Sequence, residues 1–299
     1  MKDIIKAIKQ KLLNIKIVYY ILICINYSNR RLASLACRYN VMNKFRKKYK
    51  KYIENFEIKD KKEENFNKII WICWFQGMEN APKLVKECYE STIRNNRDFK
   101  VICIDESNFK DYVEIPEFIV EKFKKRKISY AHFSDILRLE LLIKYGGIWV
   151  DATAWCSAPI PKELYELDLF CFKEHNWGDE TVNIGNWFII SKSNSKILIL
   201  TRDLLYKYWK KNDIAQDYFI FHLFFKLATE KYSYEYDKIP TLLQGNCHIL
   251  ASEIFKKYDE KRFEEIKRIS FIHKLSLKLE IPEKYSNTYY EKISLGELK

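Results

Sequence analysis

The most regular hydrophobic pattern lies near the middle of the chain, where apolar residues recur with the spacing of a helix. They are Ile136, Leu137, Leu139, Leu141, Leu142 and Ile143. The pattern predicts a well-buried helix that begins at Ser129 or Ser134, both candidate N-caps. The helix should end at Gly146 and Gly147, because glycine readily adopts the positive φ that stops a helix and reverses the chain.

A short strand is predicted directly after these glycines, over residues 148–150, where all three side chains are apolar. Asp151 follows the strand. Ligands of open α/β sheets bind outside the carboxyl ends of the strands, so the pattern places this carboxylate where chemistry usually occurs. If the chain stays extended, Thr153 points to the same side as Asp151.

The remaining pattern predicts an alternation of strands and helices. Strands are expected over residues 69–75, 100–104, 169–172 and 187–190, and helices over residues 83–95, in the stretch up to residue 127, and over residues 196–211 and 214–226. Alternation of strands and helices up to Asp151 favours parallel strands with right-handed crossovers. We therefore expect a single α/β domain over residues 68–299, with a mostly parallel central sheet flanked by helices.

The charge of the chain is concentrated at its start. The 299 residues are 47% hydrophobic, enough for a large core, and carry a net charge of +13. Residues 1–51 contain 14 Lys or Arg and one acid, Asp3, which gives +13, whereas residues 52–299 contain 39 basic and 39 acidic residues, which gives zero. The whole excess therefore belongs to the first sixth of the chain.

Residues 1–67 are predicted to form a basic helical segment followed by a connector. Its apolar stripe consists of Ile4, Ile8, Leu12 and Ile15. A lysine-rich amphipathic helix suits an anionic membrane surface, and we expect such contact through residues 1–51. The uncharged run over residues 17–28 is shorter than the roughly 20 residues that span a bilayer. A helix packed on the domain is the alternative, and no recognition motif points to nucleic acid.

The cysteines and glycines limit which metal sites and phosphate-binding loops the chain can form. The eight cysteines form no C-x-x-C pair and no zinc-binding spacing, which favours a reducing cytoplasm. The sequence has neither a P-loop nor G-x-G-x-x-G, and contains only 7 glycines. Neutralisation of a phosphate would therefore depend on side chains and a metal. We expect a cytoplasmic protein at the inner face of the membrane.

Two opposite charges interrupt the apolar helix. Asp135 and Arg138 are three residues apart, so they share one helical face. On an exposed surface such a pair contributes little. On a helix this apolar both charges need partners, and a polar ligand at the edge of the sheet would supply them.

Ten positions at fixed spacing carry a family resemblance. They are Ser134, Asp135, Leu137, Arg138, Leu142, Gly146, Gly147, Trp149, Asp151 and Thr153. The pattern resembles the core of glycosyltransferases with the GT-A fold, and more closely the capsular polysaccharide synthesis proteins, relatives of the family-32 sugar transferases and of the glucosylating clostridial toxins. The relatives usually carry Asp-x-Asp at this place. This chain has Asp151, Ala152 and Thr153, so the second aspartate is replaced by threonine. A hydroxyl adds no charge, so the need for metal is expected to be weaker or altered.

The resemblance implies roles for the residues around this motif. Trp74, at the end of the first strand, would stack on the uracil of a donor. Asp135 would bind hydroxyls of the ribose or the sugar. Arg138 would face the sugar or the phosphates and assist catalysis. Asp151, with Thr153 beside it, would hold a divalent cation, Mn²⁺ or Mg²⁺, on the donor diphosphate.

Further roles are implied outside the helix and its strand. Trp149 would lie near the donor, and Asn186 would contact sugar hydroxyls. Asp217, expected on a helix in the run DYFIFH, would assist the acceptor or stabilise a carbocation-like centre. His273 would complete the metal site, and Lys274 beside it would neutralise the diphosphate. Each role has a structural alternative. Trp149 could be a core tryptophan, Asn186 a turn residue, Asp217 an exposed carboxylate on a helix and His273 a histidine of a strand.

The resemblance predicts a glycosyltransferase that moves a sugar from a nucleotide-diphosphate donor, expected to be UDP-linked, to a hydroxyl of a capsular or other surface polysaccharide intermediate, with retention. The acceptor would be lipid-linked or an oligosaccharide. A phosphatase or phosphotransferase of the haloacid dehalogenase type also places an aspartate after an apolar strand, but Thr153 stands where its second aspartate would be. A non-catalytic sugar-binding assembly protein is the third possibility.

Overall fold

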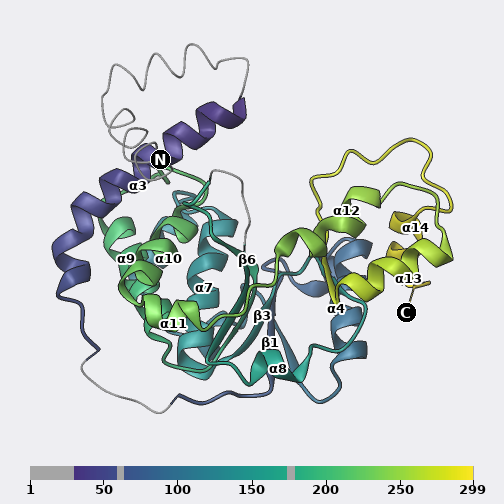
Figure 1. Ribbon diagram of the computed structural model, residues 1–299, viewed down its shortest axis with the longest axis horizontal. Helices are drawn as coiled ribbons and strands as arrows, with labels where there is room; N and C mark the ends of the chain where they lie inside the picture. Colours follow the sequence, from purple (N-terminus) through teal and green to yellow (C-terminus); the bar gives the residue numbers. More distant parts are fainter. Residues whose placement is uncertain (1–29, 59–63, 174–178, 299) are drawn as a thin grey trace, which may run out of the picture.

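A five-stranded sheet forms the centre of the protein in the computed structural model, which describes residues 30–58, 64–173 and 179–298 (Figure 1). The strands are β1 (Ile69–Cys73), β2 (Lys100–Ile104), β3 (Gly147–Val150), β5 (Leu169–Lys173) and β6 (Ile184–Ser191), in the order β2-β1-β3-β6-β5. β1 pairs in parallel with β2 and β3, whereas β6 is antiparallel to both β3 and β5. Four strands thus share one direction, which confirms the mostly parallel sheet.

Helices cover both sides of this sheet (Figure 1). On one side lie α3 (Arg30–Glu54), α6 (Glu117–Lys124), α7 (Tyr130–Tyr145), α9 (Lys196–Lys211), α10 (Ile220–Lys231) and α11 (Ser233–Asp237). On the other side lie α4 (Lys83–Asn95), α12 (Ile249–Glu253), α13 (Glu260–Ile269) and α14 (Tyr289–Ser294). Two short helices lie in connections: α5 (Phe109–Tyr112) between β2 and α6, and α8 (Lys162–Tyr165) between β4 and β5.

The junction between α7 and β3 forms as its sequence predicts. Ser129 is the N-cap of α7 and its side chain accepts a hydrogen bond from the backbone N–H of His132. Gly146 and Gly147 have φ of 68° and 95°. A Cβ on Gly146 would lie 2.6 Å from the carbonyl oxygen of Asn65, and one on Gly147 would lie 2.5 Å from that of Ile69. Both the turn and the close approach of β1 therefore require glycine.

Helix α3 shares the core of the α/β domain, although its sequence lies before the predicted start at Lys68. Met42 and Phe45 are almost fully buried, and the Phe45 ring stacks on Phe224 of α10 at 4.8 Å between centroids. Lys44 is exposed beside them. The described part of this segment is thus a helix that packs on the domain, with a basic outer face. The predicted amphipathic stripe from Ile4 to Ile15 lies outside the described residues.

A second, smaller hydrophobic core lies beyond the sheet, between α4 and the C-terminal helices. Trp155 is fully buried in it, on the short strand β4 (Ala154–Cys156). β4 pairs antiparallel with β7 (Ile272–Lys274), which matches Ala154 with Lys274. This two-stranded ribbon brings the end of the chain next to the residues that follow β3.

One predicted helix begins later than expected. The pattern placed it over residues 214–226, but α10 starts at Ile220. The hydroxyl of Tyr208 donates to the backbone carbonyl of Ile214 and accepts from the backbone N–H of Gln216. Residues 212–219 therefore form a loop tied to α9, because the Tyr208 side chain bonds to these two backbone groups.

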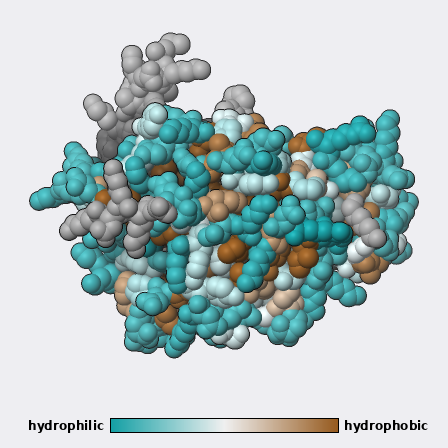
Figure 2. Space-filling view, turned by 90° about the horizontal axis from the view of Figure 1, so that it is seen from below, coloured by the Kyte–Doolittle hydropathy of each residue, from teal (hydrophilic) through white to brown (hydrophobic). Residues whose placement is uncertain are grey.

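The exposed face in Figure 2 is mainly hydrophilic, with hydrophobic residues in small groups near its middle. Among the described residues, no helix has both the length and the apolar character needed to cross a bilayer.

Candidate active site

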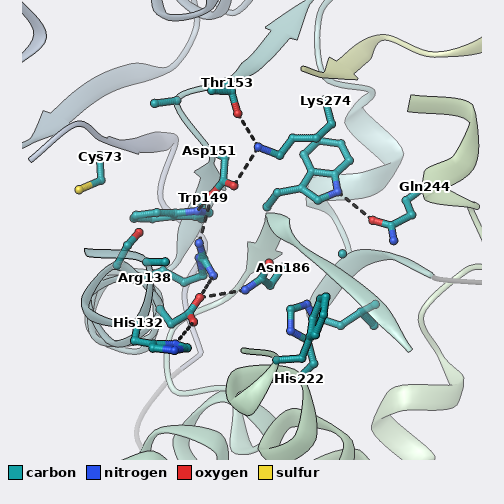
Figure 3. Close-up of a pocket in the computed structure, with 18 of the residues that line it drawn as sticks. Cys73, His132, Arg138, Trp149, Asp151, Thr153, Asn186, His222, Gln244 and Lys274 are labelled. Atoms are coloured by element: carbon teal, nitrogen blue, oxygen red, sulfur yellow. Dashed lines mark hydrogen bonds and ion pairs between the residues drawn. The ribbon is translucent and has the colours of Figure 1, made fainter. Parts of the chain in front are cut away.

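A pocket of about 460 Å³ opens where β1 and β3 end, at the carboxyl edge of the sheet. Helix α7, the first residues of β6, the loop before α10 and the β4–β7 ribbon complete its wall. The residues that the sequence predicted and that lie on this wall are Trp74, Asp135, Arg138, Trp149, Asp151, Thr153, Asn186 and Lys274 (Figure 3). The structure therefore gathers most of the predicted site in one place.

Arg138 joins the two carboxylates of the site. Its Nη1 donates to Asp135 Oδ1 at 2.5 Å and its Nη2 donates to Asp151 Oδ1 at 3.1 Å. The guanidinium carbon lies 4.8 Å from the centroid of the Trp149 ring and 5.5 Å from that of Phe221. Its side chain is only 4% exposed, so the pair at positions 135 and 138 is a buried network that continues to the end of β3.

Asp151 accepts hydrogen bonds on both carboxylate oxygens. Oδ1 also accepts from Trp149 Nε1 at 2.9 Å, and Oδ2 lies 3.2 Å from Lys274 Nζ. Burial raises the pKa of this carboxyl, but the charges of Lys274 and Arg138 and the Trp149 hydrogen bond outweigh it and hold the pKa below its ordinary value. Asp151 is therefore an anion at neutral pH.

Asp135 lies against polar groups from two elements, α7 and β6. Besides Arg138, Asn186 of β6 donates from Nδ2 to Oδ1 at 2.9 Å, and His132 Nδ1 lies 3.7 Å from Oδ2. His132 precedes Asp135 by one helical turn, so both face the pocket (Figure 3). Asn186 thus contacts Asp135 in addition to lining the cavity.

Lys274 reaches the site from the C-terminal ribbon, whereas His273 does not. Neighbouring residues of a strand point to opposite faces. Lys274 turns toward the pocket and donates to the Thr153 hydroxyl as well as contacting Asp151. His273 turns into the second core, where it is fully buried beside Trp155 and its Nε2 lies 3.0 Å from Ser157 Oγ. The expectation that His273 ligates a metal is wrong for this geometry.

The position of Asp217 also differs from the sequence prediction, which placed it on a helix. It lies in the loop before α10, where Oδ1 accepts from the backbone N–H of Phe219 at 2.7 Å and from Arg38 Nε at 3.4 Å. The pocket wall contains its neighbours Tyr218 and Phe219 but not Asp217. A buried ion pair with Arg38 explains this carboxylate, and the expected catalytic role is not supported by its position.

Several pocket residues were not singled out by the sequence. His222 of α10, His248, Trp187 and Gln244 line the cavity, and Trp187 Nε1 donates to Gln244 Oε1 at 2.9 Å (Figure 3). Burial lowers the pKa of His222 to about 4, so it is neutral at pH 7. The signal available for His132 was its one-turn spacing from Asp135. The other four residues come together only through the tertiary fold.

Four side chains of the pocket have buried polar atoms without a hydrogen-bond partner among the described residues. These atoms are Trp74 Nε1, His132 Nδ1, Arg138 Nε and His222 Nδ1. All four side chains line the pocket, so its wall carries polar groups among the aromatic rings.

A divalent cation fits the donor set poorly. The described residues contain no cluster of three or more His, Cys, Asp or Glu suited to a metal. Among the described residues of the pocket, Asp151 is the only carboxylate at the predicted metal position, and the Lys274 ammonium already lies against its Oδ2. Thr153, which replaces the second aspartate, accepts a hydrogen bond from the same ammonium. A cation placed here would meet a like charge.

The comparison with protein families agrees with the motif around Asp151. A family model described as capsular polysaccharide synthesis protein matches residues 23–293. The chain belongs to this family. The match extends from before α3 to α14, so it includes both the pocket and the C-terminal ribbon.

Three relatives illustrate the similarity. The chain is 25% identical to the O-glycosyltransferase PaGT of Phomopsis amygdali over 160 residues, 48% of this chain and 39% of that one. It is 33% identical to subversion of eukaryotic traffic protein A of Legionella pneumophila over 93 residues, 31% of this chain and 14% of that one. A solved PaToxG glycosyltransferase aligns at a TM-score of 0.41 and 17% identity, over 79% of this chain and 99% of its own. The match therefore spans less than half of either curated relative.

Proposed function

We propose that the protein is a glycosyltransferase that moves a sugar from a nucleotide-diphosphate donor to a hydroxyl acceptor. The observation that carries the proposal is the pocket at the carboxyl edge of β1 and β3, in which Arg138 joins Asp135 to Asp151. Family membership and the similarity to an O-glycosyltransferase support the same reaction class.

The donor is proposed to be UDP-linked, with its base near Trp74 and its sugar near Asp135. Trp74 directly follows β1 and lines the pocket, where its ring could stack on a base. Asp135 and Asn186, which line the same pocket, supply acceptors and donors for sugar hydroxyls. The diphosphate between them would lie near Arg138 and Lys274, the two cations of the pocket.

In the proposed reaction the bond between the anomeric carbon and the diphosphate oxygen breaks, and its electron pair leaves with the nucleoside diphosphate. The acceptor hydroxyl oxygen bonds to the anomeric carbon, and its proton passes to the departing phosphate oxygen. We propose retention of configuration, by the resemblance to retaining enzymes. Arg138 stabilises the charge that grows on the leaving group, and its contacts with Asp135 and Asp151 fix its orientation.

The acceptor is proposed to be an intermediate of a capsular or other surface polysaccharide, lipid-linked or free. The support is the family description and the basic outer face of α3, which would hold the protein at an anionic inner membrane surface. The exposed basic residues of this face are Lys44, Lys47, Lys48, Lys50 and Lys51.

A panel of nucleotide sugars tests the proposal, scored by thermal shift and by slow donor hydrolysis. One donor should raise the melting temperature of the wild type and be hydrolysed. Asp151→Asn should lower the hydrolysis rate by about 10²- to 10³-fold, because the anion that orients Arg138 is lost. Asp168→Asn, at an exposed ion pair with Lys192, is the matched control and should keep full activity. No binding of any donor would contradict the proposal.

A further inference from the structure

We propose that the Lys274 ammonium takes the place of the divalent cation in this protein, so that donor cleavage needs no metal. The inference rests on the proposed transfer reaction and concerns the same pocket. It starts from a disagreement: the family resemblance implies a metal beside Asp151, and the residues around Asp151 are arranged for a different cation.

The first observation is where Lys274 lies. Its Nζ is 3.2 Å from Asp151 Oδ2 and donates to the hydroxyl of Thr153, so it sits between the two side chains that replace an Asp-x-Asp pair (Figure 3). These are the two positions from which a metal would be held. The ammonium therefore occupies the space between them.

The second observation is the charge at these positions. An Asp-x-Asp pair offers two carboxylates, enough to balance a dication. Here Thr153 adds no charge, and the two negative charges of Asp135 and Asp151 already lie against the two positive charges of Arg138 and Lys274. The Thr153 hydroxyl accepts a hydrogen bond from Lys274 and adds no negative charge for a metal.

The third observation is that Lys274 keeps a donor available. An ammonium has three N–H groups, and Asp151 and Thr153 engage two of them. The described residues provide no partner for the third. Lys274 lines the pocket, so this N–H can reach an oxygen of a bound diphosphate. Its side chain is 19% exposed, which keeps water from screening that contact fully.

Lys274 is held in this position by the fold. β7 pairs with β4 in a register that matches Lys274 with Ala154, and the backbone N–H of Leu275 donates to the carbonyl of Thr153 at 2.9 Å. The ribbon packs through Trp155 on the second core. A cation on such a preorganised element stabilises the departing diphosphate without reorganisation at the moment of reaction.

The reaction balances without a metal. The anomeric C–O bond breaks, its electrons stay on the nucleoside diphosphate, and the charge they bring is shared by Lys274 and Arg138. The acceptor oxygen forms the new bond, and its proton passes to the departing phosphate oxygen. In the absence of acceptor, water takes the same role and the free sugar is released.

The test compares wild type with four variants. Lys274→Met keeps the length of the side chain and removes its charge, and Lys274→Arg keeps the charge. Thr153→Asp combined with Lys274→Met rebuilds two carboxylates and clears the ammonium. Lys261→Ala, an exposed lysine of α13, is the control. Circular dichroism melts establish that each variant is folded.

Two readouts are used: binding of Mn²⁺ alone, by electron paramagnetic resonance of the free ion, and donor hydrolysis in EDTA or in Mn²⁺. Wild type should bind no Mn²⁺ and hydrolyse the donor equally in both. Lys274→Met should lose about 10²- to 10³-fold in rate in either condition. Lys274→Arg should retain part of the hydrolysis rate. The double variant should bind Mn²⁺, and its hydrolysis rate should recover only when Mn²⁺ is present.

Loss of wild-type activity in EDTA with recovery in Mn²⁺ would overturn the inference, as would Mn²⁺ binding to wild type as tight as to the double variant. These outcomes leave the transferase proposal standing, because the donor is still cleaved. The transferase proposal fails separately, if no donor stabilises wild type or is hydrolysed under either condition.

Discussion

Arg138 is the residue on which the rest of the pocket depends. It is a buried cation whose charge is balanced by Asp135 and Asp151, and its Nε has no hydrogen-bond partner in the described part of the chain. Removing one member of a buried ion pair typically costs about 3–5 kcal/mol, because the other charge is left unpaired. A loss of activity on changing Arg138 therefore mixes stability and catalysis. Asp151→Asn keeps the size of the side chain but also leaves Arg138 and Lys274 less well paired, so a melting curve accompanies its activity.

Buried histidines should make the protein less stable in mild acid. Burial lowers the pKa of His273 to about 4 from its ordinary 6.5, and that of His222 likewise. The unfolded chain therefore binds these protons first as the pH falls. The free energy of unfolding should decrease between pH 6.5 and about 4 by up to about 1.4 kcal/mol per pH unit for each histidine.

Urea unfolding of wild type and His273→Gln measures this effect. Glutamine cannot be protonated, and its amide can still reach Ser157, so the variant should lose less stability than wild type between about pH 7 and about pH 5. His273 lies outside the pocket, which separates the result from catalysis. The same pH dependence in both proteins would show that His273 is not the buried neutral group inferred from its surroundings.

The α7–β3 unit could be predicted from sequence because its signals are local. Ser129, the apolar spacing and the two glycines all act within one stretch, and Asp151 follows the strand directly. The place of Lys274 depends on the pairing of β4 with β7, which lie far apart in sequence. No local pattern reveals which of His273 and Lys274 faces the pocket, since that follows from the register of the ribbon.

Helix α3 is expected to position the loops beside the pocket through Arg38. This guanidinium pairs with Asp179 in the loop after β5 and with Asp217 in the loop before α10. It also lies 4.2 Å over the ring of Phe219, which lines the pocket. Both loops would lose this common anchor if Arg38 were changed. Through these loops, Arg38 of α3 would affect the pocket without lining it.

Arg38→Met should lower kcat for donor hydrolysis by about 10- to 100-fold through misplacement of Phe219, with KM changed less. Arg46→Met is the matched control, because Arg46 lies on the same helix and pairs with the more exposed Glu230. Steady-state kinetics of the two variants decide the point. Equal effects of the two substitutions, or full activity of Arg38→Met, would show that Arg38 does not position the site.

The whole molecule joins three parts of the sequence around one pocket: the N-terminal helix α3, the α/β sheet, and the C-terminal ribbon. The predicted boundary at Lys68 follows the change in charge, but Met42 and Phe45 place α3 in the core of the sheet domain. Charge composition could not reveal this, because the buried face of α3 is only a few residues wide. Removing residues before Lys68 would therefore damage the fold.

Membrane contact is best tested in the full chain by changing charges at its start. Replacement of Lys2, Lys6, Lys9, Lys11 and Lys16 by Gln should weaken binding to vesicles that contain anionic lipid, because each basic residue near such a surface contributes about 1 kcal/mol. Sedimentation with anionic and with neutral vesicles measures it. Equal binding of both proteins to anionic vesicles would contradict the membrane contact expected of the basic residues at positions 2–16.

Phosphorus NMR of the protein with its donor distinguishes the proposed transfer from every phosphatase-type reaction at Asp151. The account requires the donor signals to be replaced by the two resonances of a nucleoside diphosphate, with no inorganic phosphate and no sugar phosphate, and requires Asp151→Asn to slow the change. Release of inorganic phosphate or a sugar phosphate, or an unchanged spectrum for every donor tested, would contradict it.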